Sequence, residues 1–463
     1  MAELPPKIKL ADAALYTLAL GTGMRWIAVA AAVGPSSLPL WLLALATFFL
    51  PLAAATAELT ARFDGEGGIY AWTRHGLGPM AGYLCGWSYW IAQLPYFAGI
   101  LYFLSGLILA ALGGDPKDTL SYLAISLGLL ALVTGVQLAG LRYGKWLPNF
   151  GTLGGWTVLA VILAVGIVLA ARGESATAFA AASYFPSLNF DTAILWGTIV
   201  FAYSGVEAVA FLRNEVEGGM KSILRVLTIV GLGSAFIYIA GTVAFLVILP
   251  QSALTRLSGF PDALRLGLAH VGAGGWAVPV IGLFALSMLG QFTAWFGVGA
   301  RLPFAAGIDA FLPEAFARRN PKTGAPTVSI LFQAAMTAVM VVLSQAGASV
   351  AGAYDFMVAT GVLTATIPYV FMFAVYLKTA RLAPVAGAWA PPGGARTSLV
   401  FGWIGMVSTL LAIACTLVPG PGEAHPAAAV FKIVASAVAM GVVGLLLYWF
   451  SNRRRLAATG AAA

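Results

Sequence analysis

Residues 192–212 read TAILWGTIVFAYSGVEAVAFL, an apolar run that is interrupted by Ser204-Gly205 and by one carboxylate, Glu207. A glycine inside a helix costs about 1 kcal/mol relative to alanine, and a charge at membrane depth costs roughly 2.5 kcal/mol or more. A second run, ADAALYTLALGTGMRWIAVAAAV (11–33), combines the same two features, because Gly21-Thr22-Gly23 is followed by Arg25. The repeated pattern predicts that both helices are broken at these points. The alternative is that the glycines only allow close helix packing.

The composition indicates a polytopic membrane protein. Of the 463 residues, 60% are hydrophobic and only 9% are charged, whereas a soluble domain carries roughly 25% charged residues. Twelve apolar runs are long enough to cross the hydrocarbon core. They lie near residues 11–33, 38–57, 80–112, 119–139, 146–171, 192–212, 223–249, 274–300, 326–345, 353–377, 398–418 and 427–450.

The basic residues assign the two sides of the membrane. The connections between twelve spans must alternate between the two sides of the membrane. On this assignment, 19 of the 25 Lys and Arg residues fall on the side that holds both chain ends, five fall on the other side, and Arg25 lies within a span. The positive-inside rule places the larger group in the cytoplasm. We therefore expect both termini to be cytoplasmic, and we interpret the net charge of +8 as a topology signal and not as a nucleic-acid footprint.

The spacing of the two interrupted runs predicts an internal repeat. Span six is the fifth span after span one, so the two enter the membrane from opposite sides, as in two inverted five-span repeats whose broken helices meet at the midplane. We expect a ten-span transport core over residues 1–397, with repeats at about 11–171 and 192–377. The segment LAPVAGAWAPPGGART then links it to spans eleven and twelve and a short tail over 398–463.

The broken helices suggest the kind of ligand. A break frees backbone groups that lipid cannot satisfy. The half-helix that begins near Thr22 to Met24 offers N–H donors to a carboxylate, and carbonyls near Phe201 to Ser204 can accept hydrogen bonds from an ammonium. The pair of breaks is suited to a zwitterion, most simply an amino acid.

Three separated motifs resemble those of the amino acid-polyamine-organocation permeases. Between spans two and three, residues 57–87 read AELTARFDGEGGIYAWTRHGLGPMAGYLCGW, with an acidic residue, a Gly-Gly-x-Tyr re-entry, Gly-Pro and Gly-Trp. The GTG of span one and the SGVEA of span six agree with this motif in order and spacing. The resemblance covers about the first ten spans and looks nearest to the bacterial glutamate/GABA antiporter branch. It implies an all-α fold of twelve transmembrane helices, a 5+5 inverted repeat of the LeuT type with two extra helices.

The resemblance also implies a site. Gly21, Thr22 and Gly23 match the turn that holds a substrate carboxylate, and Glu207 matches a gating or proton-linked glutamate. The remaining residues match the sixth-span segment, a span-eight tryptophan that walls the site and a span-three aromatic pair near the outer gate, namely Phe201, Tyr203, Ser204, Gly205, Trp295, Tyr89 and Trp90.

The chain departs from the family pattern at Arg25, where many relatives have an apolar or aromatic residue. If Arg25 faces the cavity, its charge disfavours lysine, arginine and polyamines. If it instead lies behind the turn, paired with Glu207 or with carbonyls, neutral amino acids remain the default. Span five also lacks the lysine that some proton-coupled relatives have.

The sequence therefore predicts a secondary transporter of neutral or acidic amino acids that works by exchange or proton coupling. The alternatives are a carrier of polyamines or cationic amino acids and, in a different class, a channel. No catalytic constellation is present, and the three histidines have no metal-ligand partners, so we expect no enzyme activity, cofactor or metal. We expect a monomer or homodimer in the inner cell membrane, with no nucleic-acid partner.

Overall fold

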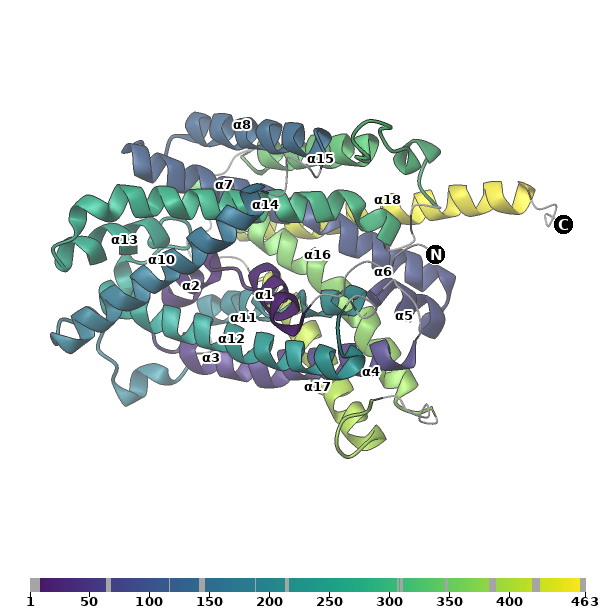
Figure 1. The fold of residues 1–463 in the computed structure, drawn as a ribbon, viewed down its shortest axis with the longest axis horizontal. Coiled ribbons are helices and arrows are strands. Elements are labelled where there is room, and N and C mark those ends of the chain that lie inside the picture. The colour runs from purple at the N-terminus through teal and green to yellow at the C-terminus, as the bar shows by residue number, and fades with distance from the viewer. Residues whose placement is uncertain are drawn as a thin grey trace.

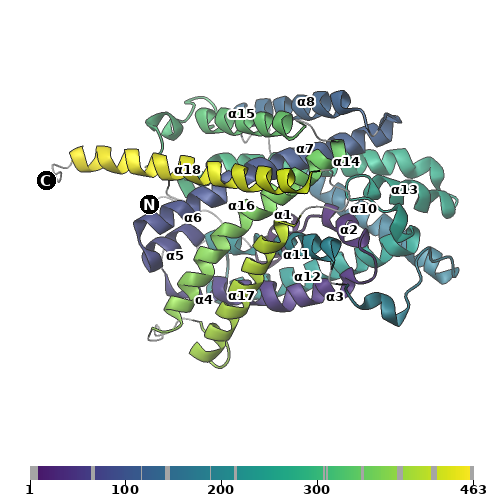
Figure 2. The same ribbon diagram turned by 180° about the vertical axis from the view of Figure 1, so that it is seen from behind.

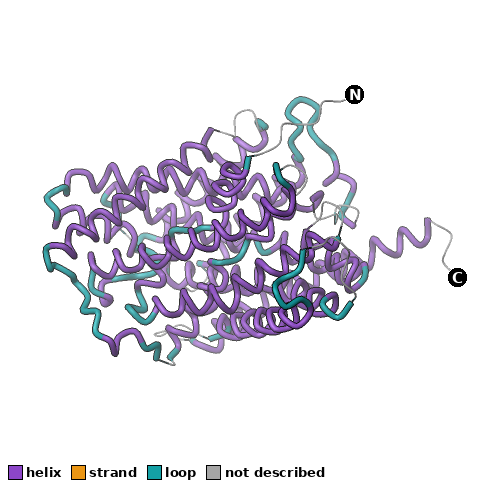
Figure 3. The backbone as a smooth tube through the Cα atoms, turned by 60° about the horizontal axis from the view of Figure 1, so that its bottom comes forward, coloured by secondary structure: helices purple, strands orange, loops and turns teal. Residues whose placement is uncertain are grey.

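The chain is built from helices. The computed structural model describes residues 9–63, 68–115, 117–140, 146–187, 189–212, 216–305, 308, 311–345, 349–382, 389–418 and 425–458. Across these residues the tube in Figure 3 runs through helices and loops without a strand. Eleven helical stretches among them are long and apolar enough to cross a bilayer. The prediction of an all-α polytopic membrane protein is confirmed.

The first half of the chain supplies five spans. The first is α1 (Leu10–Gly21) with α2 (Arg25–Ala31). The second joins α3 (Ser37–Ala44), a π-helical turn η1 (Leu45–Phe49) and α4 (Leu50–Arg62). The third joins α6 (Pro79–Ile91) and α7 (Gln93–Leu112). The fourth and fifth are α8 (Thr119–Leu138) and α10 (Trp146–Ala171).

The second half supplies seven spans. The sixth joins α11 (Phe190–Ala202) to a 3₁₀ segment, η3 (Val206–Leu212). The others are single helices, namely α12 (Gly219–Ile248), α14 (Ala277–Ala305), α15 (Thr327–Ser344), α16 (Val350–Thr379), α17 (Ala395–Thr416) and α18 (Pro426–Ala458).

The first predicted span explains why eleven continuous stretches correspond to twelve spans. Residues 11–33 are split into helices of 12 and 7 residues, and neither half reaches the ~20 residues that a bilayer requires. The sixth span changes at Tyr203 to Gly205 from α-helix to 3₁₀-helix. The predicted breaks in spans one and six are therefore confirmed.

The connections contain shorter helices that the hydropathy pattern does not reveal. These are α5 (Gly68–Leu77), α13 (Gly259–His270) and the 3₁₀ turns η2 (Ala181–Tyr184), η4 (Gln251–Ala253), η5 (Gly274–Trp276) and η7 (Glu314–Ala317). Residues 64–67 of the motif between spans two and three lie outside the described residues.

The broken spans lie at the centre of the molecule. Figure 1 shows α1, α2, α11 and α12 gathered in the middle, and α12 packs against α1, α2 and η3. The main cluster of buried apolar residues runs through these elements. Large apolar side chains are exposed instead on the peripheral helices, for example Phe431 and Phe450 of α18, as expected for surfaces that face lipid.

The last two helices differ in how they meet the rest. α17 packs along α16, α11 and α4, and Ser398 Oγ donates a hydrogen bond to the buried Glu58 Oε2 at 2.7 Å. α18 packs on α16 and α6 and then projects past the body of the molecule (Figure 2). The division into a core over 1–397 and a terminal part over 398–463 stays a prediction.

Candidate functional site

The break in the first span is held by side chains of α12. α1 ends at Gly21, and Thr22 follows in an extended conformation. The hydroxyls of Thr22 and Ser234 are 3.0 Å apart, and the N–H of Gly23 donates to the hydroxyl of Tyr238 at 3.2 Å. The N–H groups of Met24 and Arg25, at the start of α2, have no acceptor among the described residues. The break thus leaves two donors at the positive end of a half-helix.

The break in the sixth span depends on one glycine conformation. Gly205 has φ +92°, in the region that side chains with a Cβ disfavour. Its N–H points to both Glu207 Oε2 at 3.0 Å and the Tyr369 hydroxyl at 3.1 Å. Ser204 folds its hydroxyl back onto the Phe201 carbonyl at 2.6 Å. The carbonyls of Tyr203 and Ser204, which lie at the break itself, receive no hydrogen bond from the described residues.

Arg25 is a buried cation between aromatic rings. Its side chain is 4% exposed, and its Cζ lies 4.1 Å from the ring centroid of Trp26 and 4.9 Å from that of Tyr96. Nη1 is fully buried and has no acceptor among the described residues. Cation–π contacts contribute about 0.5–2 kcal/mol, whereas burial of an unpaired ion costs several kcal/mol. The rings therefore do not offset the burial of this charge.

The aromatic rings around Arg25 come from four separate spans. The Phe201 ring meets the Trp26 ring edge-on, with their centroids 5.6 Å apart. It also contacts the Tyr96 ring, with a centroid distance of 5.8 Å. Tyr96 in turn meets Trp295 of α14 at 6.4 Å. We call Arg25, Trp26, Tyr96, Phe201 and Trp295 the cation cluster. It combines one positive charge with flat apolar walls, an arrangement suited to a small anion-bearing ligand.

Glu207 occupies a second cluster that is built from hydroxyls. The carboxylate is 1% exposed, and its Oε1 accepts hydrogen bonds from Tyr89 at 2.8 Å and from Tyr369 at 2.9 Å. Oε2 accepts the Gly205 N–H, as described above. Among the described residues no cation forms an ion pair with Glu207. We call Glu207, Tyr89, Tyr369 and Gly205 the carboxylate cluster.

The two clusters follow one another along the axis of the third span. Tyr89 and Tyr96 are seven residues apart in the third span, which corresponds to about 10 Å of helix. Along the sixth span the order is reversed, with Phe201 of the cation cluster before Glu207 of the carboxylate cluster, as expected for two spans that cross the membrane in opposite directions. A molecule that moves along this axis would meet the cation cluster and the carboxylate cluster in turn.

A cavity of about 640 Å³ lies outside both clusters. It is lined by parts of α11, α15, α16 and α18, with Arg256 and Asp355 paired at 3.5 Å on its wall. Neither Arg25 nor Glu207 lines it. Val29 does, however, and lies one helical turn past Arg25 in α2, so the cavity reaches the span that carries the cation.

The structure brings most of the predicted site residues together, in two groups instead of one. Arg25, Phe201 and Trp295 join the cation cluster, while Tyr89, Gly205 and Glu207 join the carboxylate cluster. Gly21, Thr22, Gly23 and Ser204 form the breaks beside them. Tyr203 differs, because its ring contacts are with Trp41, Phe49 and Tyr238.

Sequence reasoning did not identify Trp26, Tyr96, Tyr238 and Tyr369 as site residues. Tyr96 carried a usable signal, because it follows Tyr89 by seven residues and thus lies on the same helix face. Tyr238 and Tyr369 had no comparable signal. Each is one of several aromatic residues in a long apolar span and contacts a break that is far away in sequence.

A polytopic helical protein with two broken spans around a buried cation and a buried carboxylate has the construction of a secondary transporter. The chain belongs to the amino acid permease family, since the sequence profile of that family matches residues 11–449.

Individual relatives agree with this family. An uncharacterized transporter of Legionella pneumophila is 25% identical over 402 residues, and the alignment covers 86% of this chain and 86% of that transporter. A probable agmatine/putrescine antiporter of Lactococcus lactis is 26% identical, over 73% of this chain and 72% of its own. A glutamate/gamma-aminobutyrate antiporter of Lactococcus lactis is 23% identical, over 88% of this chain and 83% of its own.

A solved structure agrees in fold. The manganese transporter of Eremococcus coleocola superposes with a TM-score of 0.56 at 13% identity, over 96% of this chain and 94% of its own. At that identity the likeness concerns the fold alone, and it accords with the predicted 5+5 arrangement.

Proposed function

We propose that this protein is a secondary active transporter of neutral or acidic amino acids. It works by alternating access, through exchange or proton coupling, in the inner cell membrane with both termini in the cytoplasm. The family supports amino acid transport in general, the positive-inside pattern supports the orientation, and the substrate class is inferred from the geometry of the two clusters.

The observation that carries the substrate class is the unpaired guanidinium of Arg25. Its Nη1 is buried without an acceptor between Trp26 and Tyr96. A carboxylate that enters the cation cluster would form a charge-assisted hydrogen bond with it, and such bonds are roughly twice as strong as neutral ones. The backbone N–H groups of Met24 and Arg25 add two further hydrogen-bond donors for that carboxylate. An amino acid carboxylate therefore completes the site, whereas a diamine leaves the cation unpaired and adds repulsion.

The ammonium of such a substrate also has partners nearby. The carbonyls of Tyr203 and Ser204 are free of donors among the described residues, and the faces of Phe201 and Tyr96 attract cations. A ligand that carries its carboxylate at Arg25 and its ammonium at the sixth-span break would bridge the two broken helices.

Glu207 supports the coupling role. Its oxygens are already held by two tyrosine hydroxyls and one N–H, and no cation among the described residues neutralises it. A carboxylate in this setting can carry a proton across the membrane with each cycle, because the tyrosines can hydrogen-bond either protonation state.

The alternative substrate class is polyamines, because one relative is named as a probable agmatine/putrescine antiporter. Proteoliposomes that contain the purified chain separate the two classes by counterflow of labelled L-glutamate, L-leucine and putrescine. We expect saturable exchange of glutamate or leucine and none of putrescine. Non-saturable flux of all three would indicate a channel instead.

Arg25 variants locate the carboxylate. Arg25→Ala should raise the Kd for the transported amino acid about tenfold or more, and Arg25→Lys should restore part of the loss because it keeps a charge but not the planar fork. Arg172→Ala, which alters an exposed arginine, is the matched control. Exchange of putrescine alone, or unchanged amino acid affinity in Arg25→Ala, would refute the assignment.

A further inference from the structure

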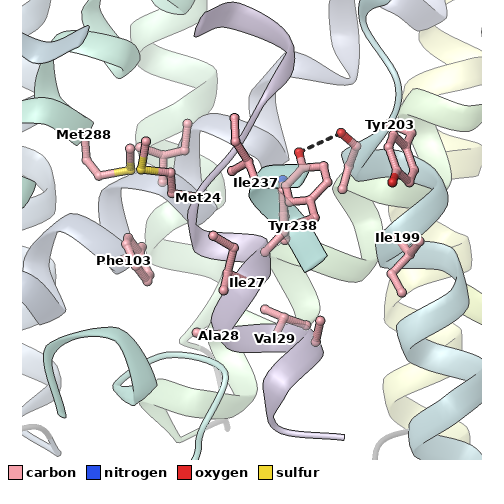
Figure 4. Packing of buried hydrophobic residues seen from close by; sticks show 14 of the residues in the cluster. Met24, Ile27, Ala28, Val29, Phe103, Ile199, Tyr203, Ile237, Tyr238 and Met288 are labelled. Carbon is pink, nitrogen blue, oxygen red and sulfur yellow. Dashed lines mark hydrogen bonds between the residues drawn. The ribbon is translucent and has the colours of Figure 1, made fainter. Parts of the chain in front are cut away.

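We infer that Tyr238 is a positioning residue whose single hydroxyl joins the two broken spans. The hydroxyl accepts a hydrogen bond from the N–H of Gly23 at 3.2 Å and donates one to the carbonyl of Ala202 at 2.9 Å. Figure 4 shows the ring reaching from α12 toward the segment of Tyr203, and the dashed line marks the bond to Ala202. One oxygen atom therefore satisfies a donor at the first break and an acceptor at the sixth.

The ring of Tyr238 is fixed in place, so its hydroxyl is a rigid link. The side chain is fully buried and stacks on Trp41, with centroids 4.2 Å apart and planes 9° from parallel. Trp41 is itself held because its Nε1 donates to Thr242 Oγ1 at 3.2 Å. Tyr203 closes the other side edge-on at 5.5 Å. This packing would persist with phenylalanine, and only the two hydrogen bonds require the hydroxyl.

The link has a consequence for the substrate path. Gly23 and Ala202 belong to different halves of the chain, yet a motion that separates their breaks must give up at least one bond to Tyr238. The two breaks are thus kept at a constant spacing while the surrounding helices rearrange. A ligand that bridges Arg25 and the sixth-span break would depend on this spacing. This last step rests on the proposed function, whereas the link itself does not.

Hydrogen–deuterium exchange of the ligand-free protein in nanodiscs tests the link. Tyr238→Phe leaves the Gly23 N–H without its acceptor and the Ala202 carbonyl without its donor. The loss of a buried hydrogen bond is expected to speed local opening about tenfold. We expect peptides that cover residues 18–27 and 199–208 to exchange faster together, with peptides from α8 and α15 unchanged.

Two further variants make the result specific. Ser234→Ala, one helical turn from Tyr238, removes the contact with Thr22 only, so it should loosen residues 18–27 and leave 199–208 unaffected. Tyr83→Phe removes a buried hydroxyl that has no partner among the described residues and should change neither peptide. If Tyr238→Phe loosens one break only, neither break, or no more than Tyr83→Phe, the inference is overturned. Because no substrate is used, this outcome is independent of the substrate assignment.

Transport kinetics with L-glutamate give a second test. A disturbed spacing should raise KM about tenfold in Tyr238→Phe for a ligand that touches both breaks. For L-glutamate we expect this loss, while binding of glutarate, which lacks the ammonium, should be unchanged. Equal losses for both ligands would indicate a general packing defect and would overturn the positioning role.

Discussion

Replacing Gly205 with alanine would test whether the sixth-span break depends on backbone conformation. Gly205 has φ +92°, and a Cβ placed there meets no atom within 4 Å. The penalty is therefore conformational and not steric. For L-residues the left-handed region costs about 1–2 kcal/mol. If the backbone relaxes instead, the N–H turns away from Glu207 and Tyr369, and the network loses hydrogen bonds of about 1 kcal/mol each.

Gly21 is a matched comparison for this substitution. A Cβ at Gly21 would also meet no atom within 4 Å, but this glycine ends a helix and is not among the glycines with positive φ. Alanine is favoured over glycine in helices by roughly 0.5–1 kcal/mol. The two substitutions should therefore have opposite signs, with Gly205→Ala destabilising and Gly21→Ala neutral or stabilising.

The assay is the apparent unfolding midpoint in detergent, followed by intrinsic fluorescence at one heating rate. Gly205→Ala should lower the midpoint by a few degrees, and Gly205→Asn should recover part of the loss because asparagine tolerates left-handed conformations. If Gly205→Ala is as stable as Gly21→Ala and Gly205→Asn is no better, the conformational account of the break is wrong.

Two further predictions concern the site. Glu207→Gln keeps the shape of the side chain but cannot exchange a proton, so transport should lose its pH dependence while substrate affinity stays within about twofold of wild type. An uptake profile across pH 5–8 measures this, and an unaltered profile would count against a coupling role. Cysteines at Thr22 and Ser204 should react with a membrane-impermeant thiol reagent and be protected by substrate. Inertness of both from either side would contradict alternating access at these breaks.

The positions of the breaks could be predicted because their causes are local. Glycine weakens a helix wherever it occurs, and a charge in an apolar run is costly in any fold, so the pairs Gly23 with Arg25 and Gly205 with Glu207 are visible in the linear sequence. The count of spans follows in the same way from run length, whereas the cytoplasmic position of both termini, inferred from the placement of Lys and Arg, stays a prediction.

The partners of the two charges could not be predicted. Sequence reasoning left open whether Arg25 pairs with Glu207. The structure instead surrounds Arg25 with Trp26 and Tyr96 and gives Glu207 to Tyr89 and Tyr369, which are 118 and 162 residues away. Hydrogen bonds over such separations depend on which helix faces meet, and an apolar span with no polar stripe does not indicate its facing side.

The sequence alone determined that this chain crosses the membrane repeatedly and that its first and sixth spans are interrupted, because hydrophobic length and helix propensity act residue by residue. Only the tertiary structure decided that Arg25 and Glu207 lie in separate clusters and that one hydroxyl, from Tyr238, reaches both breaks. These features arise when helices from both halves of the chain pack within hydrogen-bonding distance, since such bonds are directional and fail beyond about 3.5 Å.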